Sequence, residues 1–311
     1  MKVIENDHIT SYSFESICDY VFDEVNQSPK DGDVLFLQVE NFPAFLKYCE
    51  ASPNKHVIVS VRSDFGIEEQ ALAHPNKDLI RKMNFMNWDE IINRTDAYVR
   101  IQIVETAAQG CNPSDKYSIK VYAGTHCTFK EVPENVIKWF AVNVNIKHPK
   151  IENIPFGLPS DLDTKPYRQI VKDKLLYVNF SNHTPERKAL NAAFMEQNSS
   201  TLTCRTFPLA YGDYLAEMAR HKFILCPPGN GWDCWRTYEA LYLGCIPIME
   251  KSIFSSFFED LPILFIDRFF DINDVLLKEE YEKMKRKEYN WDKLKLSYWM
   301  KRIKDERNQT S

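Results

Sequence analysis

Features typical of membrane and secreted proteins are missing from this sequence. No run of about 18 apolar residues occurs, so no segment is long enough to span a bilayer as a helix. The opening residues, MKVIENDHITSYSF, lack the apolar core of a signal peptide. The eight cysteines form no C-x-x-C motif and show no spacing typical of a small disulfide framework. We therefore expect a soluble cytoplasmic protein with reduced thiols.

The sequence also has no basic stripe that could follow a nucleic-acid backbone. Its 39 basic and 44 acidic residues are interspersed and give a formal net charge of -5, which argues against nucleic-acid partners. Hydrophobic residues make up 44% and aromatics 13% of the chain, values of a folded globular protein rather than a disordered one. At 311 residues, we expect two domains with separate cores.

Apolar runs bounded by turn residues alternate with helical stretches, which predicts the α/β class with parallel sheets. In the first half we expect helices over residues 13–25, 41–51 and 133–141, and strands over 33–39, 56–61, 97–104 and 117–123. In the second half we expect strands over 174–180, 201–207, 222–226, 245–249 and 261–267, and helices over 185–197, 211–221, 233–244, 255–260 and 273–307. Both halves are expected to be Rossmann-like.

The stretch over residues 147–168 has turn formers, four prolines between 146 and 168, and no sustained period, so we interpret it as a linker. We therefore divide the chain into an acceptor-binding domain over 1–146, the linker, and a donor-binding domain over 169–290. The terminal helix over 291–311 is expected to cross back to the first domain.

The segment over 221–249, HKFILCPPGNGWDCWRTYEALYLGCIPIM, reads as a strand, a Gly/Pro loop and a helix capped by Asp233. The carboxyl end of a strand followed by a helix N-terminus suits a diphosphate, and Gly229 and Gly231 allow the backbone to approach it closely. Arg236 can neutralise the leaving diphosphate, and Glu239, three residues later, can accept hydrogen bonds from the ribose. The alternative interpretation is an ordinary turn followed by a surface ion pair of little energetic value.

This segment resembles the donor-binding signature of the exostosin-like glycosyltransferases, KF-x-L-C-P-x-G-x-G…R-x-x-E-A-L-x-x-G-C-I-P, from Lys222 to Pro247. The likeness extends over residues 147–268 and includes HPKIENIPFGL and YVNFSNHTPERKAL, whereas the first 146 residues show only compatible architecture. It implies a GT-B fold of two Rossmann-like domains facing across a cleft, an inverting mechanism and a UDP-sugar donor. Eukaryotic members generally have a membrane anchor and are luminal, whereas short anchor-less relatives occur in large algal viruses. A virus-encoded enzyme would act in the host cytoplasm.

The resemblance also implies which side chains contact the donor. They belong to the loop after the first strand of the second domain and to the Gly/Pro segment: Asn182, His183, Arg187, Cys226, Pro227, Gly229, Asn230, Gly231, Arg236 and Glu239. For Arg187 the alternative is a solvated helix residue, and for His183 it is a cap on the helix that begins at Thr184.

An inverting transferase needs a general base that removes a proton from the acceptor hydroxyl. The first candidate is Asp64, which follows a buried strand in HVIVSVRSDFG, and its alternative role is a turn or helix-capping aspartate. Glu105 and His126 are the reserve candidates. Arg236 is the second predicted catalytic residue because it stabilises the leaving group.

No metal or other cofactor is expected besides the UDP-sugar co-substrate. The two D-x-D tripeptides, Asp31-Gly32-Asp33 and Asp161-Leu162-Asp163, lie in a turn before a strand and in the linker, away from the donor segment. Cys226, Cys234 and Cys245 lack zinc-site spacing, so small buried packing is their expected use.

We therefore expect a metal-independent inverting glycosyltransferase that moves a sugar from a UDP-sugar to a hydroxyl of a glycan acceptor. Xylose is our first guess for that sugar, with galactose, glucuronic acid and arabinose also open. The alternative is a non-catalytic nucleotide- or glycan-binding module with the same fold. A dinucleotide-dependent oxidoreductase ranks below both, because G-x-G-x-x-G does not follow the first strand.

Overall fold

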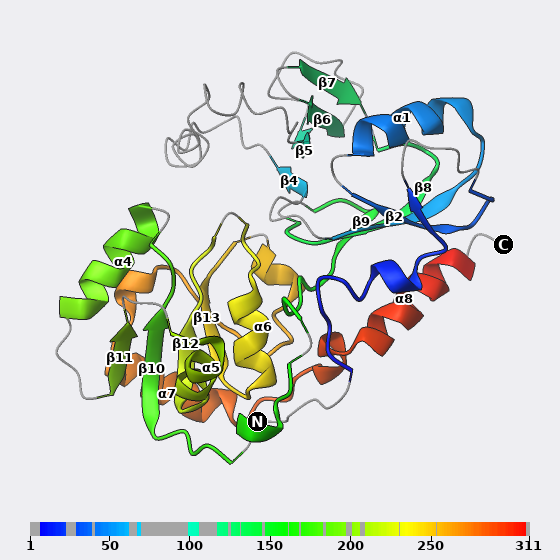
Figure 1. Ribbon diagram of the computed structural model, residues 1–311. Helices are drawn as coiled ribbons and strands as arrows, with labels where there is room; N and C mark the ends of the chain where they lie inside the picture. Colours follow the sequence, from blue (N-terminus) through cyan, green and yellow to red (C-terminus); the bar gives the residue numbers. More distant parts are fainter. Residues whose placement is uncertain are drawn as a thin grey trace. The chain divides into compact units, whose positions relative to one another are not determined.

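The computed structural model divides the chain into two compact units, which we call the N-terminal unit and the C-terminal unit. The N-terminal unit comprises the described residues of Tyr12–Ile154 and Trp299–Ser311, and the C-terminal unit those of Met1–Ser11 and Pro155–Tyr298. The structure describes residues 7–22, 29–38, 41–61, 67–69, 99–105, 117–123, 126–130, 132–144, 147–160, 162–167, 169–182, 185–196, 201–205, 209–229, 231–252 and 254–308. Figure 1 shows their elements.

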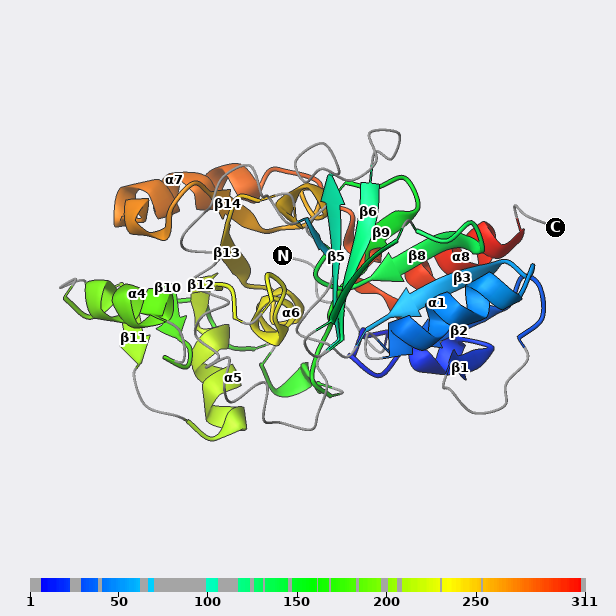
Figure 2. The ribbon, with the colours of Figure 1, turned by 90° about the horizontal axis from the view of Figure 1, so that it is seen from above.

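A five-stranded parallel sheet forms the centre of the N-terminal unit. Its strand order is β1 (Tyr20–Phe22), β2 (Val34–Leu37), β3 (His56–Ser60), β8 (Val136–Ala141) and β9 (Ile151–Asn153). Figure 2 shows α1 (Phe42–Ala51) running along these strands. Its Phe42 ring stacks on Trp139 at a centroid distance of 5.0 Å. The strands β2 and β3 are buried throughout, as expected for a parallel sheet.

A second sheet in the same unit is mainly antiparallel. It contains β4 (Ile67–Glu69), β5 (Val99–Glu105), β6 (Tyr117–Ala123) and β7 (His126–Lys130), and only the β4–β5 pair is parallel. The strands predicted over 97–104 and 117–123 are thus confirmed as β5 and β6. Their antiparallel pairing, however, differs from the continuous Rossmann-like alternation that we expected, in which parallel neighbours are joined by crossover helices.

The C-terminal unit is built on a parallel sheet covered by helices. Its order is β11 (Leu202–Arg205), β10 (Lys174–Asn179), β12 (His221–Leu225), β13 (Ile246–Glu250) and β14 (Leu264–Ile266). The helices α4 (Pro185–Glu196), α5 (Tyr211–Ala219) and α6 (Trp235–Tyr242) connect these strands, and α7 (Asp274–Met284) follows β14. One core cluster joins α4 and α7 to one face of the sheet through Leu190, Phe194 and Leu277, and α7 lies on the opposite side of the sheet from α5 (Figure 2). These strands and helices confirm the alternation predicted for the second half.

Two predicted helices are wrong. The described part of the first segment, residues 13–22, contains a short 3-10 turn, Glu15–Ile17, followed by β1, and residues 133–141 contain β8. Both segments carry apolar residues at helical spacing, but they are rich in Tyr, Val, Ile, Trp and Phe, which fit a pleated sheet better than a helix. Parallel pairing with β2 and with β3 therefore decides their conformation.

The segment predicted as a linker is divided between the units. Within it, β9 completes the N-terminal sheet by pairing with β8. Residues 155–158 pack in the C-terminal unit beside residues 8–11, which we had assigned to the first domain: the Leu158 amide donates to the Ile9 carbonyl at 2.8 Å. Gly157 has φ +77°, and a Cβ there would lie 2.5 Å from the Ile9 carbonyl oxygen, so only glycine fits this approach.

The terminal helix α8 (Leu296–Asn308) contributes residues to both units. From Trp299 onward it belongs to the N-terminal unit, where Arg302 forms an ion pair with Glu152 of β9 at 2.8 Å. Across the described ranges, every helix is too short or too polar to cross a bilayer.

Candidate functional site

The candidate site lies at the carboxyl edge of the parallel sheet in the C-terminal unit. From β10 the chain passes through α4 to β11 on one side, and then through α5 to β12 on the other side of β10. This reversal makes the carboxyl ends of β10 and β12 a topological switch point, the usual ligand position in open α/β sheets. Phe180 directly follows β10 and Cys226 directly follows β12, so the predicted donor segments meet at this edge.

Arg187 is a buried residue of α4 that holds the Gly/Pro loop in place. Only 4% of its surface is exposed. Its Nε donates to the Pro228 carbonyl at 2.9 Å, and its Nη2 donates to the Pro227 carbonyl at 3.0 Å. A Cβ on Gly229 would lie 3.2 Å from Nη2, which explains glycine at this position. The interpretation of Arg187 as a solvated helix residue is therefore wrong.

Arg236 occupies the first turn of α6, and its Nε is buried without a hydrogen-bond partner. No carboxylate of the described ranges forms an ion pair with it, and its guanidinium carbon lies 5.8 Å from the centroid of the Phe180 ring. A buried donor without a partner costs on the order of 1–3 kcal/mol, and more when it is charged. The position of Arg236 is therefore suited to an incoming anion.

Both arginines lie close to the Phe180 ring. The guanidinium carbon of Arg187 is 5.6 Å from the ring centroid, and that of Arg236 is 5.8 Å from it. Burial lowers the pKa of Arg187 below its ordinary value, and the neighbouring charge of Arg236 lowers it further. Two cations held this close repel each other, and a bound polyanion would remove that repulsion. The local electrostatics thus favour a ligand that carries more than one negative charge.

Glu239 lies on the same helix, three residues after Arg236, but it is buried with 5% exposure. Its Oε1 accepts a hydrogen bond from the Tyr211 hydroxyl at 3.0 Å, and its Oε2 accepts one from the Tyr214 hydroxyl at 2.9 Å. Burial raises the pKa of this carboxyl above its ordinary value, while the tyrosine hydrogen bonds and Arg236 act in the opposite direction. The alternative of a surface ion pair between Arg236 and Glu239 is wrong, because Glu239 is not at the surface.

Asp233 has a different role from the predicted helix cap. The N-cap of α6 is Cys234, whose side chain makes no capping hydrogen bond. The buried Asp233 carboxylate instead accepts hydrogen bonds from the Phe156 amide at 3.0 Å and from the Tyr238 hydroxyl at 2.5 Å. Burial raises the pKa of Asp233 to about 7. Since α6 begins two residues later, Asp233 connects the start of this helix to residues 155–158.

The remaining predicted donor contacts are divided between described and undescribed residues. Asn182 is exposed after β10, and its side-chain oxygen accepts a hydrogen bond from Asn191 of α4. Cys226, Pro227 and Gly231 are buried at the carboxyl end of β12. His183 and Asn230 lie outside the described residues, as do the Asp64 position and the side chains of Glu105 and His126.

The residues considered for metal binding have structural partners. Asp31 and Gly32 form the predicted turn before β2, and Asp33 accepts a hydrogen bond from the Lys30 amide at 2.7 Å. Asp161 is not described, and Asp163 accepts one from the Lys165 amide at 3.0 Å. Cys226 and Cys245 are buried as predicted, whereas Cys234 is half-buried. The described ranges contain no group of three His, Cys, Asp or Glu residues arranged to hold a metal ion.

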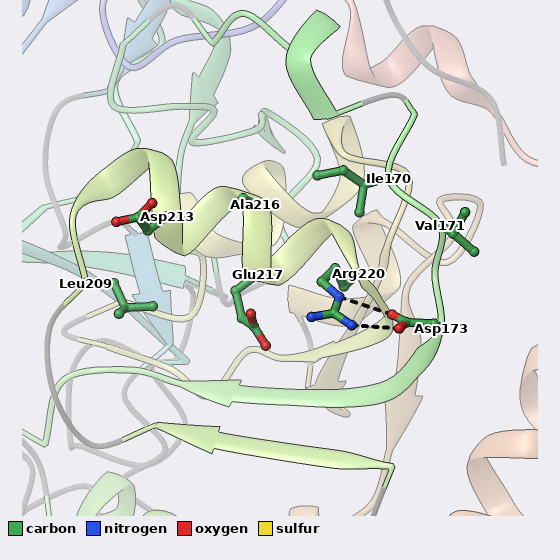
Figure 3. A pocket seen from close by; sticks show the side chains of 8 residues that line it. All are labelled: Ile170, Val171, Asp173, Leu209, Asp213, Ala216, Glu217 and Arg220. Carbon is green, nitrogen blue, oxygen red and sulfur yellow. Dashed lines mark hydrogen bonds and ion pairs between the residues drawn. The ribbon is translucent and has the colours of Figure 1, made fainter.

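A cavity of about 560 Å³ lies elsewhere on the same unit, along α5 (Figure 3). Asp173 and Arg220, which form a bidentate ion pair at 3.2 and 2.6 Å on its wall, precede β10 and β12 and thus mark the amino ends of these strands. No residue predicted to bind the donor lines this cavity. We therefore place the functional site at the opposite, carboxyl edge of the sheet, where the unpartnered charge is found.

Three aromatic residues of the site were not predicted. Phe180 lies close to both arginines, and Tyr211 and Tyr214 hold Glu239. The signal that could have identified Phe180 is its position directly after β10, at the switch point. For Tyr211 and Tyr214 only an amphipathic helix could be predicted, because their contacts with Glu239 join residues 28 and 25 positions apart in the sequence.

Comparison with known proteins gives a short similarity to a plant enzyme. No protein-family model matches the chain. Over 41 residues the chain is 51% identical to a probable glucuronosyltransferase of rice, Oryza sativa subsp. japonica. This match spans 12% of the chain and 9% of the rice protein, far less than the length of either. Over this short segment, the chain is similar to an enzyme of glycosyl transfer.

Proposed function

We propose that the protein is a glycosyltransferase whose C-terminal unit binds the diphosphate of a nucleotide-sugar donor. The observation that carries this proposal is the buried, unpartnered Nε of Arg236 beside the guanidinium of Arg187, at the switch point of a parallel sheet. A diphosphate supplies the missing acceptors and neutralises both cations. The short similarity to a glucuronosyltransferase favours a sugar as the transferred group.

Within this proposal the two arginines have different tasks. Arg187 already donates to the carbonyls of Pro227 and Pro228, so it holds the loop while adding positive charge. Arg236 keeps donors for the ligand, and charge accumulates on the diphosphate as the bond to the sugar breaks. Arg236 therefore stabilises the leaving group more strongly in the transition state than in the bound donor.

The proposed enzyme is an inverting transferase of GT-B type that uses a UDP-sugar, with xylose as the first candidate. Inversion requires that an acceptor hydroxyl attacks the anomeric carbon directly while a base takes its proton. We assign this base to Asp64 and keep Glu105 and His126 as reserves. The leaving UDP is neutralised by Arg236 and Arg187, so no metal is assigned to the reaction.

A screen of donor hydrolysis tests the proposed function. The full chain is incubated with UDP- and GDP-sugars that carry xylose, galactose, glucuronic acid or arabinose, and the released nucleotide diphosphate is measured. We expect release from at least one UDP-sugar, and its loss in Arg236→Ala. Arg268→Ala is the matched control, because Arg268 is exposed on the same unit and pairs with Asp271. Tight UDP binding without hydrolysis or transfer would identify a non-catalytic module instead.

A further inference from the structure

Tyr211 presents an unusually well fixed aromatic ring at the surface of the C-terminal unit. It is the first residue of α5 and remains 46% exposed. Its hydroxyl donates to Oε1 of the buried Glu239 at 3.0 Å. Burial and the adjacent Glu239 charge raise the pKa of the Tyr211 hydroxyl above its ordinary value, so the group stays a donor. One end of the ring is therefore anchored while part of it faces solvent.

The second support of this ring is Tyr214. The two rings stack with centroids 6.2 Å apart and planes inclined by 23°, and Tyr214 is itself held by Oε2 of Glu239 at 2.9 Å. Tyr214 also packs against the buried Tyr177 ring of β10, at a centroid distance of 6.2 Å. The orientation of Tyr211 is thus set before any ligand binds, which reduces the entropy lost on binding.

The anchored ring belongs to the same edge of the sheet as the arginine site. The helix α5 begins after β11, which is paired with β10. Glu239 connects the ring to α6, because it lies one helical turn after Arg236. A single buried residue, Glu239, therefore connects Tyr211 to the helix that carries Arg236.

We infer that the exposed face of Tyr211 stacks on the nucleobase of the donor and that Glu239 is the residue that positions it. This inference rests on the proposed function, since it needs a nucleoside diphosphate whose phosphates lie at Arg236. Stacking uses the π-face that every base possesses, so the ring selects a nucleotide over a bare diphosphate and accepts uracil, adenine and guanine alike. Glu239 then acts through Tyr211, whose hydroxyl its carboxylate holds at 3.0 Å.

Binding of UDP and of inorganic pyrophosphate to the full chain tests the inference. Calorimetry on Tyr211→Ala should show about 5- to 150-fold weaker UDP binding, the range of base–aromatic stacking, and unchanged pyrophosphate binding. Unchanged pyrophosphate binding also demonstrates that the variant is folded. Phe270→Ala is the matched control: Phe270 is 60% exposed in the 3-10 turn Phe269–Asp271 of the same unit, and its loss should alter neither affinity.

The role of Glu239 is tested through the ratio of UDP affinity to pyrophosphate affinity. Tyr211→Phe keeps the ring but removes its anchor, so the ratio should fall by less than in Tyr211→Ala. Glu239→Met, which removes the acceptor oxygens at similar side-chain volume, should lower the same ratio. Adding Tyr211→Phe to it should lower the ratio no further, because both changes remove the hydrogen bond between Tyr211 and Glu239. Additive losses would overturn the positioning role.

The outcomes separate this inference from the proposed function. A wild-type chain that binds UDP and pyrophosphate, together with a Tyr211→Ala variant that binds UDP equally well, overturns the stacking inference alone. A wild-type chain that binds neither ligand overturns both. Equal loss of UDP and pyrophosphate binding in a folded Tyr211→Ala variant would mean that Tyr211 supports the arginine site and contacts no base.

Discussion

Arg187 and Arg236 hold their guanidinium carbons 5.6 and 5.8 Å from the centroid of one phenylalanine ring, that of Phe180. The first arginine comes from α4 and the second from α6, on helices that follow two neighbouring strands. Such an arrangement is unfavourable in an isolated protein, because both charges lose hydration and repel each other. It becomes favourable when a dianionic group binds, because the anion neutralises both charges. This neutralisation is the physical basis of the proposed donor site.

The loop over residues 226–231 should depend on Arg187 for its order. Arg187→Ala leaves the carbonyls of Pro227 and Pro228 without their donors, so amide exchange in the peptide covering residues 225–235 should become faster. Arg236→Ala should leave this exchange unchanged, because the described ranges show no hydrogen bond from Arg236 to the loop. Hydrogen-exchange mass spectrometry on both variants checks the difference. Equal exchange in the wild-type chain and Arg187→Ala would contradict the loop-holding role.

Much of the C-terminal unit could be predicted from its sequence, because its buried parallel strands are short apolar runs between clear turn and helix signals. The segment over 221–249 is the strongest case, where β12, α6 and β13 all appear in the expected order. The helices predicted over 13–25 and 133–141 were wrong because their apolar residues satisfy a helical period while their side chains favour a sheet. Only pairing with strands that are distant in the sequence decides whether such segments form helices or strands.

The charged residues of the candidate site could be predicted, but the residues that contact them could not. Arg236 and Arg187 could be proposed from a strand–loop–helix pattern and a family resemblance, whereas their shared contact with the Phe180 ring could not. Asp233 illustrates the reason: its position before α6 predicted a cap, yet its carboxylate holds Phe156, a residue 77 positions earlier in the chain. Long-range contacts of this kind leave no trace in the local sequence.

The stability of the C-terminal unit should depend on pH through the titration of Asp233. Its folded pKa of about 7 lies above the ordinary value of 3.8, so between these values the folded state binds more protons than the unfolded state. Stability contributed by the protonated form is therefore present at low pH and lost as the pH rises towards 7, with a full effect on the order of 4 kcal/mol.

Asp233→Asn removes this titration while its amide oxygen can still accept from the Phe156 amide and the Tyr238 hydroxyl. Thermal unfolding of both proteins between pH 5 and pH 8 provides the measurement. The midpoint of the wild-type chain should fall relative to that of the variant as the pH rises. Parallel curves would show that Asp233 ionises normally in the folded protein.

Removal of divalent cations should leave the transferase activity intact. In the proposed reaction, Arg236 and Arg187 supply the positive charge that a divalent cation would otherwise contribute to the leaving diphosphate. Release of UDP from the best donor should therefore proceed at the same rate in excess EDTA as in its absence. Activity that disappears in EDTA and returns with manganese would contradict this expectation.

The proposed base is tested by Asp64→Asn, which keeps the size of the side chain but removes its ability to accept a proton. Turnover should fall by about two to four orders of magnitude, the usual contribution of a general base, whereas UDP affinity should stay nearly constant. Steady-state kinetics and UDP calorimetry on the same preparation give both numbers. A variant that turns over at almost the normal rate would move the role to Glu105 or His126.

The central claim, that Arg236 holds the donor diphosphate, is tested most directly by UDP calorimetry on the wild-type chain, Arg236→Ala and Arg268→Ala. Hydrogen bonds to a charged group contribute about 1.5–3 kcal/mol, so Arg236→Ala should bind UDP about 10- to 150-fold more weakly, with Arg268→Ala equal to wild type. Turnover of Arg236→Ala should fall further than its affinity. Wild-type UDP affinity in a folded Arg236→Ala variant would contradict the claim and place the donor site elsewhere.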